Sequence, residues 1–212
     1  CLGAQRKGMV IYMRDTDYME VFERSMKMPP VSQEDGLRIL QKLGLELPSQ
    51  PESEEGWSFV SALEAAGLGV WDYSDGTWVA TSTQFYAFDA EFPDAAHMYE
   101  HYFAGLESIT SDPKLTFRLQ DYLNVQVKNG QGTMVVYFLV NGGIVEYNAQ
   151  VNSDWIDMGI QRAINDFLEL LGVEKRFYSI EASQGRIVFY CTETWARAFE
   201  EAALCFMSYD GV

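Results

Sequence analysis

The stretch of residues 123–171 constrains the fold of this chain more than any other part of its sequence. Three apolar runs are separated by Asn129-Gly130 and Asn141-Gly142, and a segment of helical periodicity follows them. Asn and Gly tolerate the positive φ angles that tight hairpin turns require. The pattern therefore predicts three consecutive antiparallel strands with a helix after them. Such a meander with a helix laid across it is typical of a layered α+β fold.

The middle run, residues 131–140, is apolar on both of its faces. Alternate residues of a strand point to opposite sides of a sheet. One set is Met134, Val136, Phe138 and Val140, and the other is Val135, Tyr137 and Leu139. We therefore expect a central strand covered on both sides, with Phe138 almost fully buried. The next run, residues 144–151, alternates apolar and polar residues, which predicts a strand with one solvent-exposed face.

A helix is predicted directly after these strands. Asn152, Ser153 or Asp154 can cap its start, and Gly172 suits its end. Its apolar residues recur at helical spacing: Ile156, Ile160, Ala163, Ile164, Phe167, Leu168 and Leu171. This stripe has to face the sheet, so Ile164 is expected to be almost fully buried.

The whole chain is predicted to form one α+β domain over residues 1–212. Its largely antiparallel sheet is built from hairpins and strand-then-helix units, with helices packed on it. The chain is long enough for a full core. Residues 48–56, rich in Pro and Glu, predict an exposed loop, and residues 110–114 are a candidate subdomain seam.

Elsewhere the chain alternates between helical and extended patterns. Residues 57–66 favour a helix, and residues 77–81 and 84–92 are predicted to pair as strands. Units such as residues 85–103 and 144–160 both run from a strand into a helix. They indicate either an ancestral duplication or the ordinary construction of α+β folds.

The charge of the chain excludes one class of partner. It carries 31 acidic and 15 basic residues, for a net charge of −16. There is no Lys or Arg between Lys42 and Lys114, a stretch with thirteen acidic residues. A nucleic-acid-binding surface needs the opposite balance, so we expect no nucleic acid as a partner and no direct adhesion to anionic lipid. The acidic stretch suits either a solvated surface or one that faces cations or basic ligands.

The three cysteines do not form a disulfide framework. Cys191 and Cys205 lie at the two ends of a predicted strand-to-helix unit, and a helix of about 13 residues would separate them by roughly 20 Å. We expect both to be free thiols.

Cys1 is the first residue of the sequence, ahead of a short polar leader. In this it resembles a mature bacterial lipoprotein, whose signal peptide is cut just before a lipid-modified cysteine. The resemblance implies an extracytoplasmic protein that meets the membrane only through a lipid anchor on Cys1. Two alternatives remain: a fragment boundary, and an N-terminal nucleophile activated by its own α-amine.

The only two histidines belong to one motif, His97-Met-Tyr-Glu100-His101. It fits H-x-x-E-H, and the segment AHMYEHYFAG is similar to the AHFLEHMxFxG of the inverzincin metallopeptidases. The resemblance implies a zinc ion on His97 and His101, with Glu100 as general base and Glu174 nearest to the place of a third ligand. The same three motif residues also suit a solvated helix face with no metal.

Aromatic residues gather between residues 57 and 78. The residues Trp57, Trp71, Tyr73 and Trp78 can line a groove for a glycan or a peptide, or they can serve as core and loop packing.

Taken together, these features of the sequence favour a non-enzymatic, extracytoplasmic binding or assembly module of a bacterial cell envelope, without a cofactor. Its partner would be an envelope protein, a peptide or a glycan. The alternative is a zinc-dependent hydrolase that uses the H-x-x-E-H motif.

Overall fold

The computed structural model describes residues 31–47, 57–72, 74, 77–92, 97–182 and 185–211. The helices are α2 (Gln33–Lys42), α3 (Phe59–Gly67), α4 (Met98–Ile109), α5 (Ile160–Leu170) and α6 (Glu193–Ala203). The strands are β1 (Val70–Asp72), β2 (Thr77–Val79), β3 (Phe85–Asp89), β4 (Phe117–Lys128), β5 (Gln131–Val140), β6 (Gly143–Asn152), β7 (Arg176–Glu181) and β8 (Gly185–Cys191).

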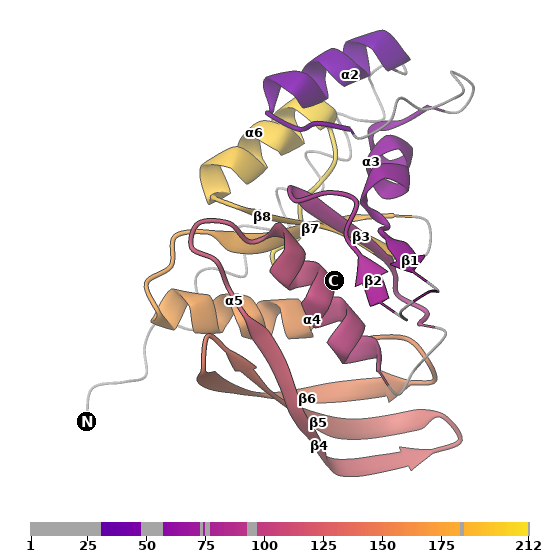
Figure 1. Ribbon diagram of the computed structural model, residues 1–212, viewed down its shortest axis with the longest axis vertical. Helices are drawn as coiled ribbons and strands as arrows, with labels where there is room; N and C mark the ends of the chain where they lie inside the picture. The colour runs from indigo at the N-terminus through magenta and orange to yellow at the C-terminus, as the bar shows by residue number, and fades with distance from the viewer. Residues whose placement is uncertain are drawn as a thin grey trace.

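Helices and sheets alternate through the molecule in four layers (Figure 1). Helices α2, α3 and α6 cover one side of a sheet of order β3-β8-β7, which we call the middle sheet. Helices α4 and α5 lie between this sheet and a second one of order β4-β5-β6, the outer sheet. Every strand pair is antiparallel, including the small β1-β2 ladder. The prediction of an α+β fold with a largely antiparallel sheet and packed helices is confirmed, although the strands form separate sheets.

The outer sheet is the meander predicted from the Asn-Gly turns. Asn129 and Asn141 have φ angles of 55° and 49°, and the glycines after them 76° and 80°. Strand β5 is central, as expected, and pairs with β6 over its whole length. Phe138 and its inward neighbours are fully buried, but the opposite face of β5 is only half-buried among the described residues. The strand was expected to be covered on both sides; among the described residues that cover is complete on the Phe138 face and partial on the other.

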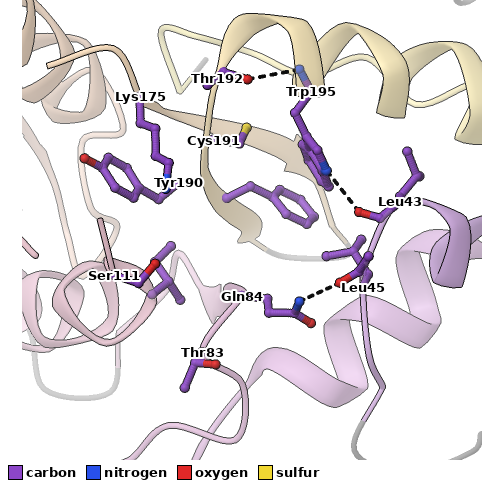
Figure 2. A pocket seen from close by; sticks show the side chains of 13 residues that line it. Leu43, Leu45, Thr83, Gln84, Ser111, Lys175, Tyr190, Cys191, Thr192 and Trp195 are labelled. Carbon is purple, nitrogen blue, oxygen red and sulfur yellow. Dashed lines mark hydrogen bonds between the residues drawn. The ribbon is translucent and has the colours of Figure 1, made fainter. Parts of the chain in front are cut away.

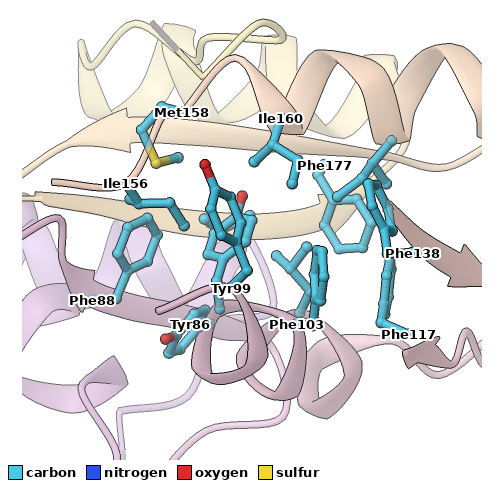
Figure 3. Packing of buried hydrophobic residues seen from close by; sticks show 14 of the residues in the cluster. Tyr86, Phe88, Tyr99, Phe103, Phe117, Phe138, Ile156, Met158, Ile160 and Phe177 are labelled. Carbon is cyan, nitrogen blue, oxygen red and sulfur yellow. The ribbon is translucent and has the colours of Figure 1, made fainter. Parts of the chain in front are cut away.

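The middle sheet has a separate apolar core on each side, because its alternate residues face opposite layers. The inner core fills the space between the two sheets, around α4 and α5 (Figure 3). Its strand residues from the middle sheet are Tyr86, Phe88, Phe177, Val188 and Tyr190. The outer core lies under α2, α3 and α6, and its strand residues are Phe85, Ala87, Tyr178, Ile180, Ile187 and Phe189. Each strand therefore contributes to both cores.

Aromatic rings dominate the inner core. The ring of Phe103 on α4 lies 4.7 Å from that of Phe138 and 5.8 Å from that of Phe117, centroid to centroid. Figure 3 shows these rings together between α4 and the strands. Ile164 on α5 is also fully buried in this core, which confirms its predicted position. Its members come from both sides of residues 110–114, the candidate seam.

Helix α5 begins later than the sequence predicts. Its N-cap is Gly159 rather than one of residues 152–154, and no side chain caps it. The reason is Asp157, whose carboxylate accepts hydrogen bonds from the backbone N–H groups of Gln150 (2.7 Å) and Gly159 (3.0 Å). Trp155 also forms bridges with Glu91 and Asn152. These contacts hold residues 155–159 in a turn against the sheet.

Strand pairing differs from the prediction around residues 77–92. Strand β2 pairs with β1, and β3 pairs with β8, about a hundred residues further along the chain. The predicted pairing of residues 77–81 with 84–92 is wrong. Helix α3 confirms the helix expected from residue 57, and its Ser58 and Ser61 form a reciprocal capping box. The predicted loop at residues 48–56 lies outside the described residues.

Candidate ligand-binding pocket

A cavity of about 300 Å³ opens at one end of the middle sheet, where β8 ends and β3 and β7 begin (Figure 2). This volume is at the lower end of the range of small-molecule sites. Its lining comes from six separate segments of the chain: Leu43, Gly44, Leu45, Thr83, Gln84, Ile109, Ser111, Lys175, Phe189, Tyr190, Cys191, Thr192 and Trp195.

Side-chain hydrogen bonds hold one wall of the pocket, the loop that follows α2. The Gln84 side-chain amide donates to the carbonyl of Gly44 (2.6 Å) and accepts from the backbone N–H of Glu46 (2.8 Å). The indole N–H of Trp195 donates to the carbonyl of Leu43 (3.0 Å). Figure 2 shows two of these bonds reaching the loop from different sides. Because the loop is tied to both β3 and α6, the cavity is formed before any ligand arrives.

Among the described residues of the lining, Lys175 is the one charged side chain, and none of them is a carboxylate. It belongs to the loop between α5 and β7. Its ammonium lies 5.4 Å from the centroid of the Tyr190 ring, a cation–π distance. This contact with the Tyr190 ring keeps the ammonium of Lys175 at one side of the cavity.

Cys191 ends β8 and lines the pocket as a free, half-buried thiol. Burial raises the pKa of this thiol to about 12, and the nearby positive charge of Lys175 opposes the shift only in part. At neutral pH the thiol is therefore protonated and a poor nucleophile. Cys205 is also free, as predicted, but it is not part of the lining.

The first turn of α6 also faces the cavity. Thr192 is its N-cap, and the hydroxyl of this residue accepts a hydrogen bond from the backbone N–H of Trp195 (3.3 Å). The first N–H groups of a helix have no partner within the helix and give its start a partial positive charge. Both residues line the pocket, so this end of α6 adds to the effect of Lys175.

The H-x-x-E-H motif lies at the other end of α4 from the pocket. His97 is the N-cap of α4 and is exposed, Glu100 is exposed in its first turn, and His101 is half-buried. The His101 ring lies 6.3 Å from that of Phe92, centroid to centroid. Along α4, His97 lies roughly 18 Å and His101 roughly 12 Å from the pocket residue Ile109.

A metal ion needs more than these two imidazoles. Glu174, the expected third ligand, is exposed in the loop after α5. Within the described residues, no group of three or more His, Cys, Asp and Glu side chains is arranged to hold a metal ion. The zinc hypothesis thus receives no support from the geometry, and it stays a prediction to be tested in solution.

The aromatic residues expected to form a groove pack in different places. Trp57 lies edge-on to Phe59, 5.3 Å from it, against the outer core. Trp78 packs against Tyr86 at the same distance, beside the inner core. Trp71 opposes Trp78 in the β1-β2 ladder, and Tyr73 lies outside the described residues. The two tryptophans whose side chains are described are therefore not brought together.

The residues that do converge carry little local signal in the sequence. Trp195 stands in an amphipathic helix as one more apolar residue, and Lys175 is a single basic residue in a loop. A Thr three residues before Trp195 marks the start of α6, and that start is the one local signal for this end of the pocket. The remaining residues are brought together by the pairing of β8 with β3 and with β7, and by the hydrogen bonds from Gln84 and Trp195 to the loop after α2.

No family model, curated protein or solved structure matches this chain. In the described part of the chain, no helix has the length and apolar character to cross a membrane. Cys1, the predicted site of lipid attachment, lies outside the described residues.

Proposed function

We propose that this protein is a non-enzymatic binding module whose ligand enters the pocket at the end of the middle sheet. The main support for the proposal is that one wall of the cavity, the loop at residues 43–46, is fixed in place. Hydrogen bonds made by the side chains of Gln84 and Trp195 connect this loop to two other segments of the chain. A preformed cavity lets a ligand bind without a large cost for ordering the loop.

The chemistry of the lining favours binding over catalysis. Its one thiol, Cys191, is protonated at neutral pH, and neither a histidine nor a carboxylate lines the cavity beside it. A cysteine nucleophile requires a nearby base or a lowered pKa. The described lining supplies neither, while it offers hydroxyl groups, aromatic faces and one cation for recognition.

From the sequence we expect a peptide, a glycan or a protein of the cell envelope as the partner. A cavity of about 300 Å³ takes a small molecule, or one terminal group of a longer peptide or glycan. An extracytoplasmic location and a lipid on Cys1 remain part of the proposal from the sequence alone.

Ligand protection of Cys191 tests the proposal, because this thiol lines the cavity. A library of small soluble fragments is screened by nuclear magnetic resonance against the full chain carrying Cys1→Ser. Fragments that shift pocket residues should slow the alkylation of Cys191 at pH 9. Cys205 is the internal control, since it lies outside the lining and its alkylation rate should not change. The proposal fails when no fragment both shifts pocket residues and protects Cys191.

A further inference from the structure

The two sides of the pocket differ in chemistry. Figure 2 shows Lys175, Tyr190 and Ser111 on one side, and Trp195 with Leu43 and Leu45 on the other. The first group offers an ammonium and a hydroxyl, and the second offers an indole and aliphatic carbons. A ligand that contacts both sides has to be charged or polar at one end and apolar at the other.

The charge of the polar end follows from the lining. The chain as a whole has 31 acidic and 15 basic residues, yet the described residues that line the cavity include one lysine and no acid. The start of α6, marked by Thr192, adds a partial positive charge. The thiol of Cys191 is neutral, so it contributes no opposing charge. The ammonium of Lys175 and the start of α6 therefore favour an anion at this side of the cavity, in a chain whose net charge is −16. Two carboxylates outside the lining act in the opposite sense: Asp112, which acts on Tyr190, and the exposed Glu193 in the first turn of α6.

The apolar end combines the buried side chains of Leu45 and Phe189 with the half-buried ones of Leu43 and Trp195. Phe189 is 1% exposed, and the centroid of its ring lies 5.5 Å from that of Trp195, with the two ring planes tilted by 39°. The hydrogen bond from the indole N–H of Trp195 to the carbonyl of Leu43 fixes the orientation of the indole ring. Such a wall selects a short aliphatic or aromatic group, whose burial contributes binding energy in proportion to its area.

Resting on the proposed function, we infer that the ligand is a small organic carboxylate with an apolar body. Its carboxylate contacts the ammonium of Lys175, and its apolar body packs against Trp195 and Leu43. The cavity volume of about 300 Å³ limits the body to the size of a single ring or a short alkyl chain.

Phenylacetate and phenylacetamide test this inference, because they have the same shape and differ in charge. Their dissociation constants are measured by titration, with the indole N–H signal of Trp195 as reporter. Phenylacetate should bind about tenfold tighter than the amide, since a charge-assisted hydrogen bond is stronger than a neutral one. Acetate, which lacks the ring, should bind at least about tenfold more weakly than phenylacetate.

Variants of Lys175 assign the preference to one side chain. Lys175→Gln should remove the difference between phenylacetate and its amide, whereas Lys175→Arg should retain it. Lys128→Gln, at the exposed tip of the β4-β5 hairpin, makes the same change in net charge and should leave the preference unchanged. The comparison of the two probes on the wild-type chain does not depend on the folding of any variant.

The outcomes separate this inference from the proposed function. Equal binding of phenylacetate and phenylacetamide at the pocket overturns the inference and leaves the binding module standing. An equal effect of Lys128→Gln and Lys175→Gln also overturns it, because the preference would then reflect net charge alone. If neither probe nor any library fragment protects Cys191, the proposed function itself fails.

Discussion

The side-chain amide of Asn165 on α5 forms two hydrogen bonds with the backbone of Phe177 on β7. It donates to the carbonyl at 2.8 Å and accepts from the N–H at 2.8 Å. Two residues further along β7, Ser179 exchanges backbone hydrogen bonds of 2.9 and 2.7 Å with Ser208. The side of β7 that faces away from β8 is an edge of the middle sheet. Its backbone groups are therefore paired partly by the Asn165 side chain, in the place where another strand would lie.

Asn165→Ala should destabilise the protein by about 2–4 kcal/mol. It leaves the fully buried N–H of Phe177 without this partner, at a cost of about 1–3 kcal/mol, and it also removes a hydrogen bond from each of the carbonyls of Phe177 and Tyr209. The carbonyl of Phe177 keeps the hydrogen bond from Gln161 (3.2 Å). Urea denaturation measures the change. The control is Asp166→Ala, on the exposed face of the same helix, where the loss should stay below about 1 kcal/mol. Similar losses for both variants contradict the role given to the Asn165 amide.

Phe138→Ala should cost about 3–5 kcal/mol, because the large side chain is fully buried in the inner core and leaves a cavity. Ile144→Ala is the matched control in the same sheet. Its side chain is 58% exposed, so its loss should be below about 1 kcal/mol. Both values come from denaturant unfolding followed by tryptophan fluorescence. A small effect at Phe138 is incompatible with the described core.

The thiol of Cys191 makes stability depend on alkaline pH. In the unfolded chain it ionises near 9, whereas burial in the pocket keeps it protonated up to about 12. The folded state therefore binds a proton that the unfolded state has released between these values. The resulting stability is complete below pH 9 and is lost as the pH rises toward 12.

Cys191→Ala isolates this contribution from the titration of other groups. The free energy of unfolding of the wild-type chain should fall relative to that of Cys191→Ala between pH 8 and pH 11. Denaturant unfolding of both proteins at each pH supplies the comparison. A constant difference across this range shows that the folded protein does not raise the pKa of the thiol.

Protein purified without a histidine tag should contain well below one zinc ion per chain. A catalytic zinc ion needs three protein ligands. Among the described residues, no carboxylate or thiol joins His97 and His101 as a third ligand. Elemental analysis measures the metal. Stoichiometric zinc, together with a peptidase activity that His101→Ala abolishes without lowering the melting temperature, would restore the hydrolase hypothesis.

The lipid on Cys1 is testable in cells that express the gene with its own upstream sequence. Lipoprotein processing requires a signal peptide before the cysteine, with a charged start, an apolar segment and small residues at the cleavage site. We expect labelled palmitate to be incorporated into the protein and Cys1→Ser to abolish the label. Native protein that fractionates with the cytosol contradicts the extracytoplasmic prediction.

The parts of the fold that depend on neighbouring residues could be predicted from the sequence. The Asn-Gly turns have positive φ angles that few residues adopt, so they determine the β4-β5-β6 meander locally. The apolar run of β5 likewise predicted that Phe138 is buried, but it did not distinguish this face from the opposite, half-buried one. The start of α5 could not be predicted, because Asp157 bonds to Gln150 in a different element and competes with residues 152–154 for the helix start.

The candidate site was beyond sequence analysis for a related reason. Tyr190 and Thr83 approach each other only because β8 pairs with β3, and no local pattern specifies a partner about a hundred residues away. The H-x-x-E-H motif can be recognised in the sequence because its residues lie within five consecutive positions. The lining of the pocket, in contrast, is shared among six segments, each of which is unremarkable alone.

Phe189 and Tyr190 are neighbours in the chain, yet their side chains belong to the outer and the inner core. Because the same backbone supports both, β8 can open only when both cores are disrupted. Its amide hydrogens should then exchange with deuterated solvent only through global unfolding. Both side chains also line the pocket. The central outer-sheet strand β5, whose Phe138 is fully buried in the inner core, should also exchange only through global unfolding. Ligand binding to the native state should therefore slow exchange in β5 and in β8 by the same factor, although β5 does not line the pocket.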